Sequence, residues 1–207
     1  MRYSRIPDET IRRLPVYLRG LILASGQGKK NISSNDLADS VGAYPWQIRK
    51  DFSYFGDFGT RGVGYNVRKL TKEIKKILKI NIGQKAALVG VGNLGMAILA
   101  FPGFGIYGLD ITAAFDVNPK KIGKKINNVT IENVSELRKI KRSKIKLAVM
   151  AVPRNAAQET ADVLIEAGVR GILNFSPCYL VVPKKVKVIT IDIAMDMARL
   201  PYYMPAG

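Results

Sequence analysis

A glycine-rich turn is the part of the chain whose residue types and spacing best suit chemistry. The run Gly90-Val91-Gly92-Asn93-Leu94-Gly95 has the spacing G-x-G-x-x-G and stands between the apolar stretches 86–89 and 96–100. In such a strand–turn–helix unit the first glycine permits the tight turn, the second lets backbone approach a pyrophosphate, and the third lets helix pack on strand. Unpaired N–H groups at the start of the helix hold the pyrophosphate. We therefore predict that these six residues bind a dinucleotide.

An acidic residue ends the next predicted strand, residues 111–116. Asp116 follows Gly95 by twenty-one residues. A carboxylate there accepts hydrogen bonds from ribose hydroxyls and repels a 2′-phosphate, which favours NAD(H) over NADP(H). The alternative interpretation is an ordinary turn residue before Asn118-Pro119.

Strands and helices alternate through residues 85–191, which predicts an α/β domain with a Rossmann-like, doubly wound parallel sheet. We expect strands near residues 129–131, 145–152, 171–175 and 186–191, and helices from residue 135 and over 155–167. Ligands of such sheets bind outside the carboxyl ends of the strands. Further candidates for cofactor binding therefore stand there: Val152, Pro153, Asn174 and Ser176.

The predicted site lacks the general acid or base that hydride-transfer catalysis normally needs. The chain has no histidine, which removes the commonest general acid/base and the commonest metal ligand. Asn174, Ser176 and Arg154 are poor acids or bases near neutral pH, and Tyr179 and Lys184 have no evident partner. We predict no catalytic residue and no metal, and a site that binds the cofactor as a signal. A small nicotinamide-dependent oxidoreductase with a basic appendage remains the alternative.

Charge points to an anionic partner. The chain has 33 lysines and arginines against 16 acids, a formal net charge of +17. Residues 1–80 carry a net +9 and residues 120–146 a net +8. Composition does not decide which region meets the partner. Because the second region is poor in aromatic residues, we expect it to be a solvated outer face.

The N-terminal third reads as a helix-turn-helix. A first helix is predicted over 7–25, and Ser33 and Asp36 have the spacing of a capping box for a short second helix that stops at Gly42. Pro45 then suits the first position of a helix over 46–55. A helix that opens with polar and basic residues after a short turn is typical of DNA recognition. We predict that it contacts DNA through Tyr44, Trp46, Gln47, Arg49, Lys50, Ser53 and Tyr54.

A glycine-rich segment after this helix predicts a wing. Residues 56–65 hold four glycines around Arg61. Such a hairpin can place an arginine in a minor groove. The alternatives are a solvated helix face for Arg49 and Lys50 and a surface turn for Arg61. An amphipathic helix over 66–80 and a linker over 81–84 are expected to complete the domain.

Together these residues resemble the Rex family of redox-sensing transcriptional repressors over nearly the whole chain. The resemblance is carried by residues 46–56, 59–65, 90–95, 115–117 and 171–177. It implies a homodimeric winged-helix repressor that holds a pseudo-palindromic operator at low NADH and releases it when NADH binds. It also implies that Lys50 reads the major groove and Arg61 the minor groove. A regulator that responds to another nucleotide, such as coenzyme A, is the second alternative.

The resemblance also assigns a switch to the end of the chain. It implies that a helix over about 192–203 is exchanged between subunits, and that Asp192 pairs with Arg19 in the closed form. Phe101 stands where some members carry a tyrosine whose hydroxyl couples the nicotinamide to the exchanged helix. Its ring can pack against the cofactor, but the hydrogen bond to Asp192 cannot form. Ile193 likewise stands where some members place an aromatic residue, so we expect redox discrimination to be tuned differently here.

Three segments follow: a winged-helix domain over 1–80, a Rossmann NAD(H)-binding domain over 85–191, and a swapped helix and tail over 192–207. The single cysteine, Cys178, excludes an internal disulfide and fits a reducing cytoplasm. No apolar run approaches the ~18 residues of a membrane span, and the N-terminus has no signal-peptide pattern. We therefore expect a cytoplasmic protein without a membrane partner.

Overall fold

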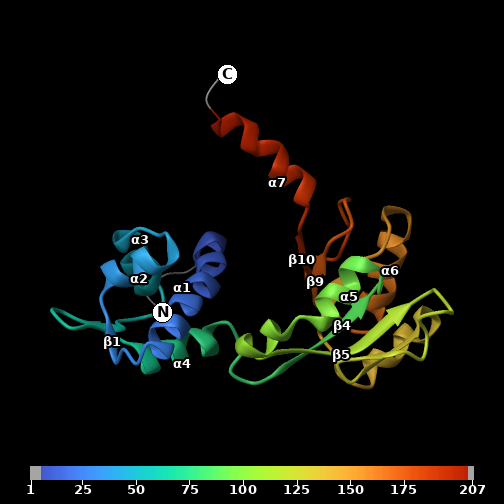
Figure 1. Cartoon of the computed structure of the whole chain (residues 1–207), viewed down its shortest axis with the longest axis horizontal. Helices are drawn as coiled ribbons and strands as arrows, with labels where there is room; N and C mark the ends of the chain where they lie inside the picture. The colour runs from blue at the N-terminus through green and yellow to red at the C-terminus, as the bar shows by residue number, and fades with distance from the viewer. Residues whose placement is uncertain (1–5, 205–207) are drawn as a thin grey trace. The chain divides into compact units, whose positions relative to one another are not determined.

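The computed structural model describes residues 6–204, and the chain divides into two compact units between Ile82 and Gly83 (Figure 1). This boundary falls inside the linker predicted over 81–84. Two of the predicted segments extend beyond the described residues: 1–80 by its first five residues and 192–207 by its last three. Each unit is described by itself.

The N-terminal unit is a helical bundle with a small antiparallel sheet. It comprises α1 (Asp8–Gly26), β1 (Asn31–Ile32), α2 (Ser34–Val41), α3 (Pro45–Ser53), β2 (Gly59–Thr60), β3 (Gly64–Asn66) and α4 (Val67–Ile77). The sheet has the order β1-β3-β2. Ser33 and Asp36 form the predicted capping box of α2, and Gly42 ends that helix in the left-handed conformation. Leucines and isoleucines from all four helices fill the core: Leu14, Leu18, Leu21, Leu37, Ile48, Leu70 and Ile74.

The C-terminal unit is built on a seven-stranded sheet of order β10-β9-β8-β4-β5-β7-β6, parallel except for β6. Its strands are β4 (Gln84–Val89), β5 (Leu109–Asp116), β6 (Lys125–Ile126), β7 (Val129–Asn133), β8 (Leu147–Met150), β9 (Gly171–Asn174) and β10 (Lys187–Thr190). Its helices are α5 (Asn93–Ala100), α6 (Arg154–Glu166) and α7 (Ile193–Arg199), with the 3₁₀ segments η1 (Pro102–Tyr107), η2 (Val134–Lys141) and η3 (Leu200–Tyr203).

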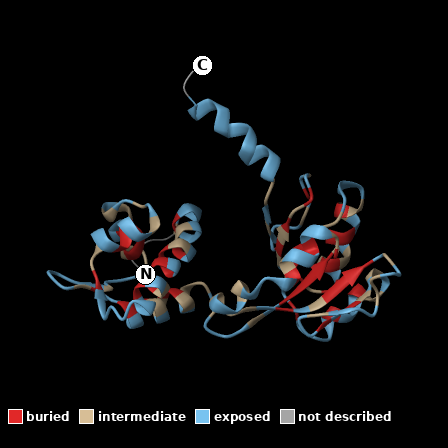
Figure 2. Ribbon diagram, viewed as in Figure 1, coloured by how far each residue is buried: buried red, intermediate tan, exposed pale blue. Residues whose placement is uncertain are grey.

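Alternate residues of β4 supply two separate cores. Ala87 and Val89 join the core that also contains buried residues of α6 and η2. Ala86 and Leu88 join the opposite core, which Leu99 of α5 completes. Because successive side chains of a strand point to opposite faces, a strand covered on both sides reads as a continuous apolar run. Figure 2 shows this central strand as buried.

Several elements differ from the sequence-based expectation. The helix predicted from residue 135 is a 3₁₀ segment, and the predicted terminal helix is α7 followed by η3. The short elements β1, β6 and η1 were not predicted. Strand β6 forms because Asn127 and Asn128 both adopt positive φ, which makes a tight hairpin to β7. Such two-residue strands have no periodicity that a sequence could reveal.

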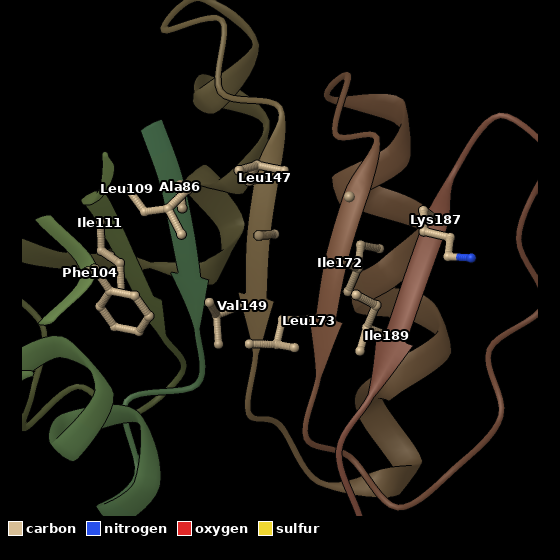
Figure 3. A pocket seen from close by; sticks show the side chains of 12 residues that line it. Ala86, Phe104, Leu109, Ile111, Leu147, Val149, Ile172, Leu173, Lys187 and Ile189 are labelled. Atoms are coloured by element: carbon tan, nitrogen blue, oxygen red, sulfur yellow. The ribbon is translucent and has the colours of Figure 1, made fainter. Parts of the chain in front are cut away.

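The face of the sheet that α5 covers in part has no helical cover over β8, β9 and β10. Figure 3 shows side chains from β5, β4, β8, β9 and β10 along an apolar groove of about 410 Å³. Among its lining residues are Phe104, Leu147, Leu173 and Ile189. The chain between β9 and β10 contains no helix, so this crossover leaves the face bare. Every residue of α7 and η3 is exposed as well, including Met195 and Met197 (Figure 2).

Candidate nucleotide site and DNA-binding surface

The glycine turn lies where predicted, between β4 and α5, and its three glycines have different reasons to be glycine. Gly90 has φ +89°, and a Cβ atom there would lie closer than 3.0 Å to the carbonyl oxygen of Ala151. A Cβ atom on Gly95 would lie even closer to the carbonyl oxygen of Gly90. Gly92, the N-cap of α5, has an ordinary φ of −72° and open space around it. The fold itself thus requires the first and third glycines, whereas the open side of Gly92 suits the approach of a ligand.

Asp116 lies at the carboxyl end of β5 and binds the turn directly. It is 8% exposed. Its Oδ2 accepts a 2.8 Å hydrogen bond from the Val91 N–H, and its Oδ1 accepts a 2.7 Å bond from the Asn118 N–H. The second bond is the contact expected if Asp116 is an ordinary turn residue before Asn118. Since each carboxylate oxygen can accept more than one bond, both retain capacity for a ribose hydroxyl.

Lys121 is a residue of this site that the sequence did not reveal. Its Nζ donates a 2.8 Å hydrogen bond to the carbonyl oxygen of Val91 and lies 3.6 Å from Asp116 Oδ2. The residue belongs to the basic region 120–146, which we predicted to be a solvated face, and it is an exception to that expectation. Its neighbour Lys120 is exposed. A positive charge therefore stands beside the acid that was expected to repel a 2′-phosphate.

Asn174 and Ser176 stabilise the ends of the neighbouring strands. Both are fully or almost fully buried. The Asn174 Nδ2 donates to the carbonyl oxygens of Ser176 and Cys178 and to Thr190 Oγ1, and its Oδ1 accepts from the Ser176 N–H. Ser176 Oγ donates to the Val152 carbonyl oxygen at 2.7 Å. Their polar atoms thus bond to the loops after β8 and β9, so a role in cofactor binding would be indirect. Pro153, by contrast, is exposed beside half-buried Val152.

Phe101 stands at the opposite end of α5 from the glycine turn. It is 57% exposed, and its ring packs edge-to-face against Phe104 with centroids 5.3 Å apart. An eight-residue helix is about 12 Å long, so only an extended ligand can touch both the turn and this ring.

The outer side of α3 carries the predicted DNA contacts. Arg49 and Lys50 are exposed, and the stacked rings of Tyr44 and Trp46 are 69% and 55% exposed. Ser53 and Tyr54 are half-buried. The opposite side of the helix buries Ile48, Asp51 and Phe52. This division leaves one polar, aromatic and cationic face for a partner.

The wing forms as predicted between β2 and β3, with Arg61 exposed in the connecting turn. Gly64 has φ +87°, and a Cβ atom there would collide with the Ile32 carbonyl. A groove of about 410 Å³ lies between the wing, Arg49 and the start of α2. Arg49 Nη1 donates to Ser34 Oγ in this groove at 2.7 Å. Two arginines, Arg49 and Arg61, therefore line one groove.

Gln47 is less free than its neighbours on α3. We predicted an outward side chain, but it is half-buried and its Nε2 donates to Asp51 Oδ1 at 3.0 Å. Asp51 belongs to a buried polar cluster that the sequence analysis missed. No signal in the sequence alone pairs residues of α1 with this acid, which lies more than thirty positions away from them.

A winged helical unit joined in one chain to a sheet with a dinucleotide-binding glycine turn is typical of one class of protein, the ligand-responsive DNA-binding regulators.

Among residues 6–204, no helix is long and apolar enough to cross a membrane. Within the same part of the chain, no cluster of three or more His, Cys, Asp or Glu residues has the arrangement of a metal site.

Comparison with known proteins identifies the family. Residues 5–53 match the family model described as "Putative DNA-binding protein N-terminus", and residues 81–178 match the model "CoA binding domain". The redox-sensing transcriptional repressor Rex of Desulfitobacterium hafniense is 45% identical over 98% of this chain and 97% of its own. The chain belongs to the Rex family of redox-sensing transcriptional repressors, which confirms the resemblance drawn from its residues.

Solved structures of a relative agree with this assignment. The Rex-family repressor RSP in complex with β-NAD⁺ and operator DNA has 35% identity and a TM-score of 0.89, covering 97% of this chain and 93% of that one. RSP in complex with β-NADH has 34% identity and a TM-score of 0.85, covering 97% and 95%.

Proposed function

We propose that this protein represses transcription by holding operator DNA when NADH is scarce and releasing it when NADH binds. The observation that carries the proposal is the presence, in one chain, of an exposed recognition helix with a wing and of a Gly90–Gly95 turn bonded to Asp116. The Rex relative RSP, solved both with NAD⁺ plus operator DNA and with NADH, supports it.

For the DNA, we assign base contacts in the major groove to Lys50 and entry into the minor groove to Arg61. Both side chains are exposed, one on the outer face of α3 and the other at the tip of the wing. Arginine suits a narrow, electronegative minor groove. Tyr44, Trp46, Gln47, Arg49, Ser53 and Tyr54 are assigned to the surrounding contacts.

For the nucleotide, we assign the pyrophosphate to the Gly90–Gly95 turn and the first N–H groups of α5. The ribose is assigned to Asp116, and the mouth of the site to Val152 and Pro153. Phe101 is assigned to the nicotinamide end of the ligand. The bound cofactor acts as a signal and not as a co-substrate: the chain contains no histidine, the commonest general acid or base, and Asn174 and Ser176 at the strand ends are poor acids or bases.

We further propose a homodimer that exchanges the segment 192–207. Two observations support it: the apolar groove over β8, β9 and β10 is bare, and α7 buries none of its residues. A contiguous bare apolar face of this kind marks an interaction site. Asp192 now caps α7 by accepting from the Met195 N–H, and Arg19 is exposed, so both are available for the Asp192–Arg19 pair of the closed form.

The proposed switch requires a modest coupling energy. A ~100-fold change in operator affinity on NADH binding corresponds to a coupling free energy of about 2.7 kcal/mol between NADH and DNA binding, which a few contacts can supply. The domain limits that we assign to these roles are 1–80 for DNA, 85–191 for nucleotide and 192–207 for exchange.

The test is fluorescence anisotropy of a labelled operator, selected from a random duplex library, titrated with protein in the presence of NADH, NAD⁺, NADPH or coenzyme A. We expect NADH to release the duplex and NAD⁺ to compete with NADH for the same site. Release by coenzyme A alone would replace the proposed ligand. Turnover of NADH with a panel of carbonyl substrates would favour the oxidoreductase alternative.

A further inference from the structure

The recognition helix contains a buried carboxylate that the proposed contacts do not use. Asp51 is 0% exposed and accepts five hydrogen bonds. Arg13 is bidentate, with Nε 2.6 Å from Oδ2 and Nη2 2.8 Å from Oδ1. Tyr17 Oη donates to Oδ2 at 2.7 Å, and Thr10 Oγ1 donates to Oδ1 at 2.9 Å. The fifth donor is Gln47 Nε2, at 3.0 Å from Oδ1.

These bonds keep Asp51 ionised. Burial alone would raise the pKa of Asp51, but the hydrogen bonds from Arg13, Tyr17 and Thr10 outweigh it and hold the pKa below its usual value. The same cluster raises the pKa of Tyr17, through burial and its bond to Asp51. A buried carboxylate is tolerated only with such a complete set of donors. Asp51 therefore acts as a pure acceptor toward every partner.

The donors come from two elements. Thr10, Arg13 and Tyr17 belong to α1, whereas Gln47 lies one turn before Asp51 on α3. Asp51 thus bonds α3 to α1. The next residue, Phe52, holds the same face of α3 through edge-to-face contacts with Tyr17, at 5.5 Å between centroids, and with Tyr65 of the wing, at 5.2 Å. Two consecutive residues therefore fix the rotation of the recognition helix about its axis.

The cluster also fixes one side chain on the outer part of the helix. Because a carboxylate can only accept, the amide of Gln47 must turn its nitrogen toward Asp51. Its oxygen, Oε1, is then the acceptor left to meet a donor from outside, beside the second N–H of Nε2. In the major groove adenine presents the donor N6 beside the acceptor N7, which matches an amide oxygen and N–H together, and cytosine presents the donor N4. Guanine and thymine present no donor there for Oε1.

We propose that Asp51 is a specificity-determining positioning residue, which holds the recognition helix on α1 and orients Gln47 to accept from adenine or cytosine. The inference rests on the proposed operator binding. Asp51 touches no DNA in it and acts only through Gln47 and the placement of α3.

The experiment selects preferred duplexes from a random library with the wild type, Gln47→Ala, Asp51→Asn and a control, Glu73→Gln. Glu73 forms an exposed ion pair with Lys76 on α4, so the control removes one carboxylate charge from the same unit without touching α3. We expect Asp51→Asn to lose the same adenine or cytosine preference that Gln47→Ala loses, and to bind wild-type sites at least ten times more weakly. The control should keep every preference.

Two outcomes in that experiment overturn the proposal: a folded Asp51→Asn variant with unchanged preferences, or one that weakens binding equally for all sequences. A merely structural role would give the second result. Circular dichroism and thermal unfolding decide whether each variant is folded.

A measurement without DNA covers the case in which Asp51→Asn does not fold or the wild type selects no duplex. In ¹⁵N–¹H spectra of the free wild type, assigned with Gln47→Ala, the Nε2 proton of Gln47 that bonds Asp51 should be shifted from the position of an exposed glutamine amide and should exchange slowly with solvent. Chemical shifts and a solvent-exchange rate like those of an exposed glutamine amide overturn the proposed orientation. If the wild type selects no duplex while the amide is fixed, the operator-binding proposal fails and the orientation of Gln47 stands.

Discussion

Replacing Gly92 by alanine separates nucleotide binding from folding more cleanly than any other change at the glycine turn. Gly92 has φ −72°, and a Cβ atom there meets no atom within 4 Å. Alanine at a compatible position stabilises a protein by about 0.4–1 kcal/mol, because it restricts the unfolded chain. Glycine is preferred to alanine at an N-cap, which offsets this gain, so the free protein should melt within about 4 °C of the wild type.

The same methyl group would stand where the pyrophosphate must approach the backbone. We expect Gly92→Ala to weaken NADH binding at least ~100-fold, which corresponds to about 2.7 kcal/mol. The variant should still bind operator DNA, and NADH should no longer release it. Titration by NADH fluorescence and operator anisotropy measures both quantities on one preparation.

Gly95→Ala is the matched contrast. Its Cβ atom would lie closer than 3.0 Å to the Gly90 carbonyl oxygen, which is backbone and cannot move aside as a side chain can. Overpacking of this kind costs about 1–3 kcal/mol, so the melting temperature should fall by roughly 2–12 °C. If Gly92→Ala binds NADH like the wild type, the turn does not hold the pyrophosphate and the assigned site is wrong.

Three further predictions concern single charges. Lys121→Met should weaken NADH binding about fivefold and NADPH binding more, because it removes the cation beside Asp116 and its hydrogen bond to Val91. In the same titration, the control Lys120→Met should leave both affinities unchanged. Lys50→Ala should weaken operator binding about 10- to 100-fold and relax one base preference. Arg61→Ala should weaken binding to A·T-flanked sites most. Anisotropy on a panel of duplexes measures both effects, and wild-type binding by both variants would refute the groove assignments. The lowered pKa of Asp51 stabilises the fold at pH values above the unfolded pKa of about 4, and this stabilisation is lost as pH falls through the folded pKa. In thermal unfolding between pH 7 and 3, the melting temperature of Asp51→Asn should therefore fall less steeply with acid than that of the wild type.

The features that the sequence predicted are those with local chemical signals. The capping box at Ser33, the left-handed stop at Gly42 and the G-x-G-x-x-G turn each depend on residues within a few positions of one another. The long apolar runs of β4 and β8 predicted buried strands, and the structure confirms both, with β4 contributing buried residues to both cores. The parallel sheet and the wing follow from such signals and from their order along the chain.

The features that the sequence did not predict depend on distant contacts. Asp51 gains its role only when α1 brings Arg13 and Tyr17 to it, and Lys121 differs from Lys120 only because it reaches the carbonyl of Val91. Asn174 is likewise a polar residue at a strand end whose hydrogen bonds turn inward. A residue type and its neighbours in sequence do not specify which tertiary partner satisfies it.

Redox sensing must arise away from the glycine turn. A ligand shifts an equilibrium only by its difference in affinity for the two states, and NADH and NAD⁺ share the adenosine and pyrophosphate that are assigned to Gly92 and Asp116. Those residues can therefore set affinity but cannot distinguish the two oxidation states. The polar atoms of Asn174 and Ser176 are already bonded within the protein, whereas the Phe101 ring is exposed. We therefore propose that Phe101, together with the segment that the second subunit is proposed to supply, discriminates between the charged and the neutral nicotinamide.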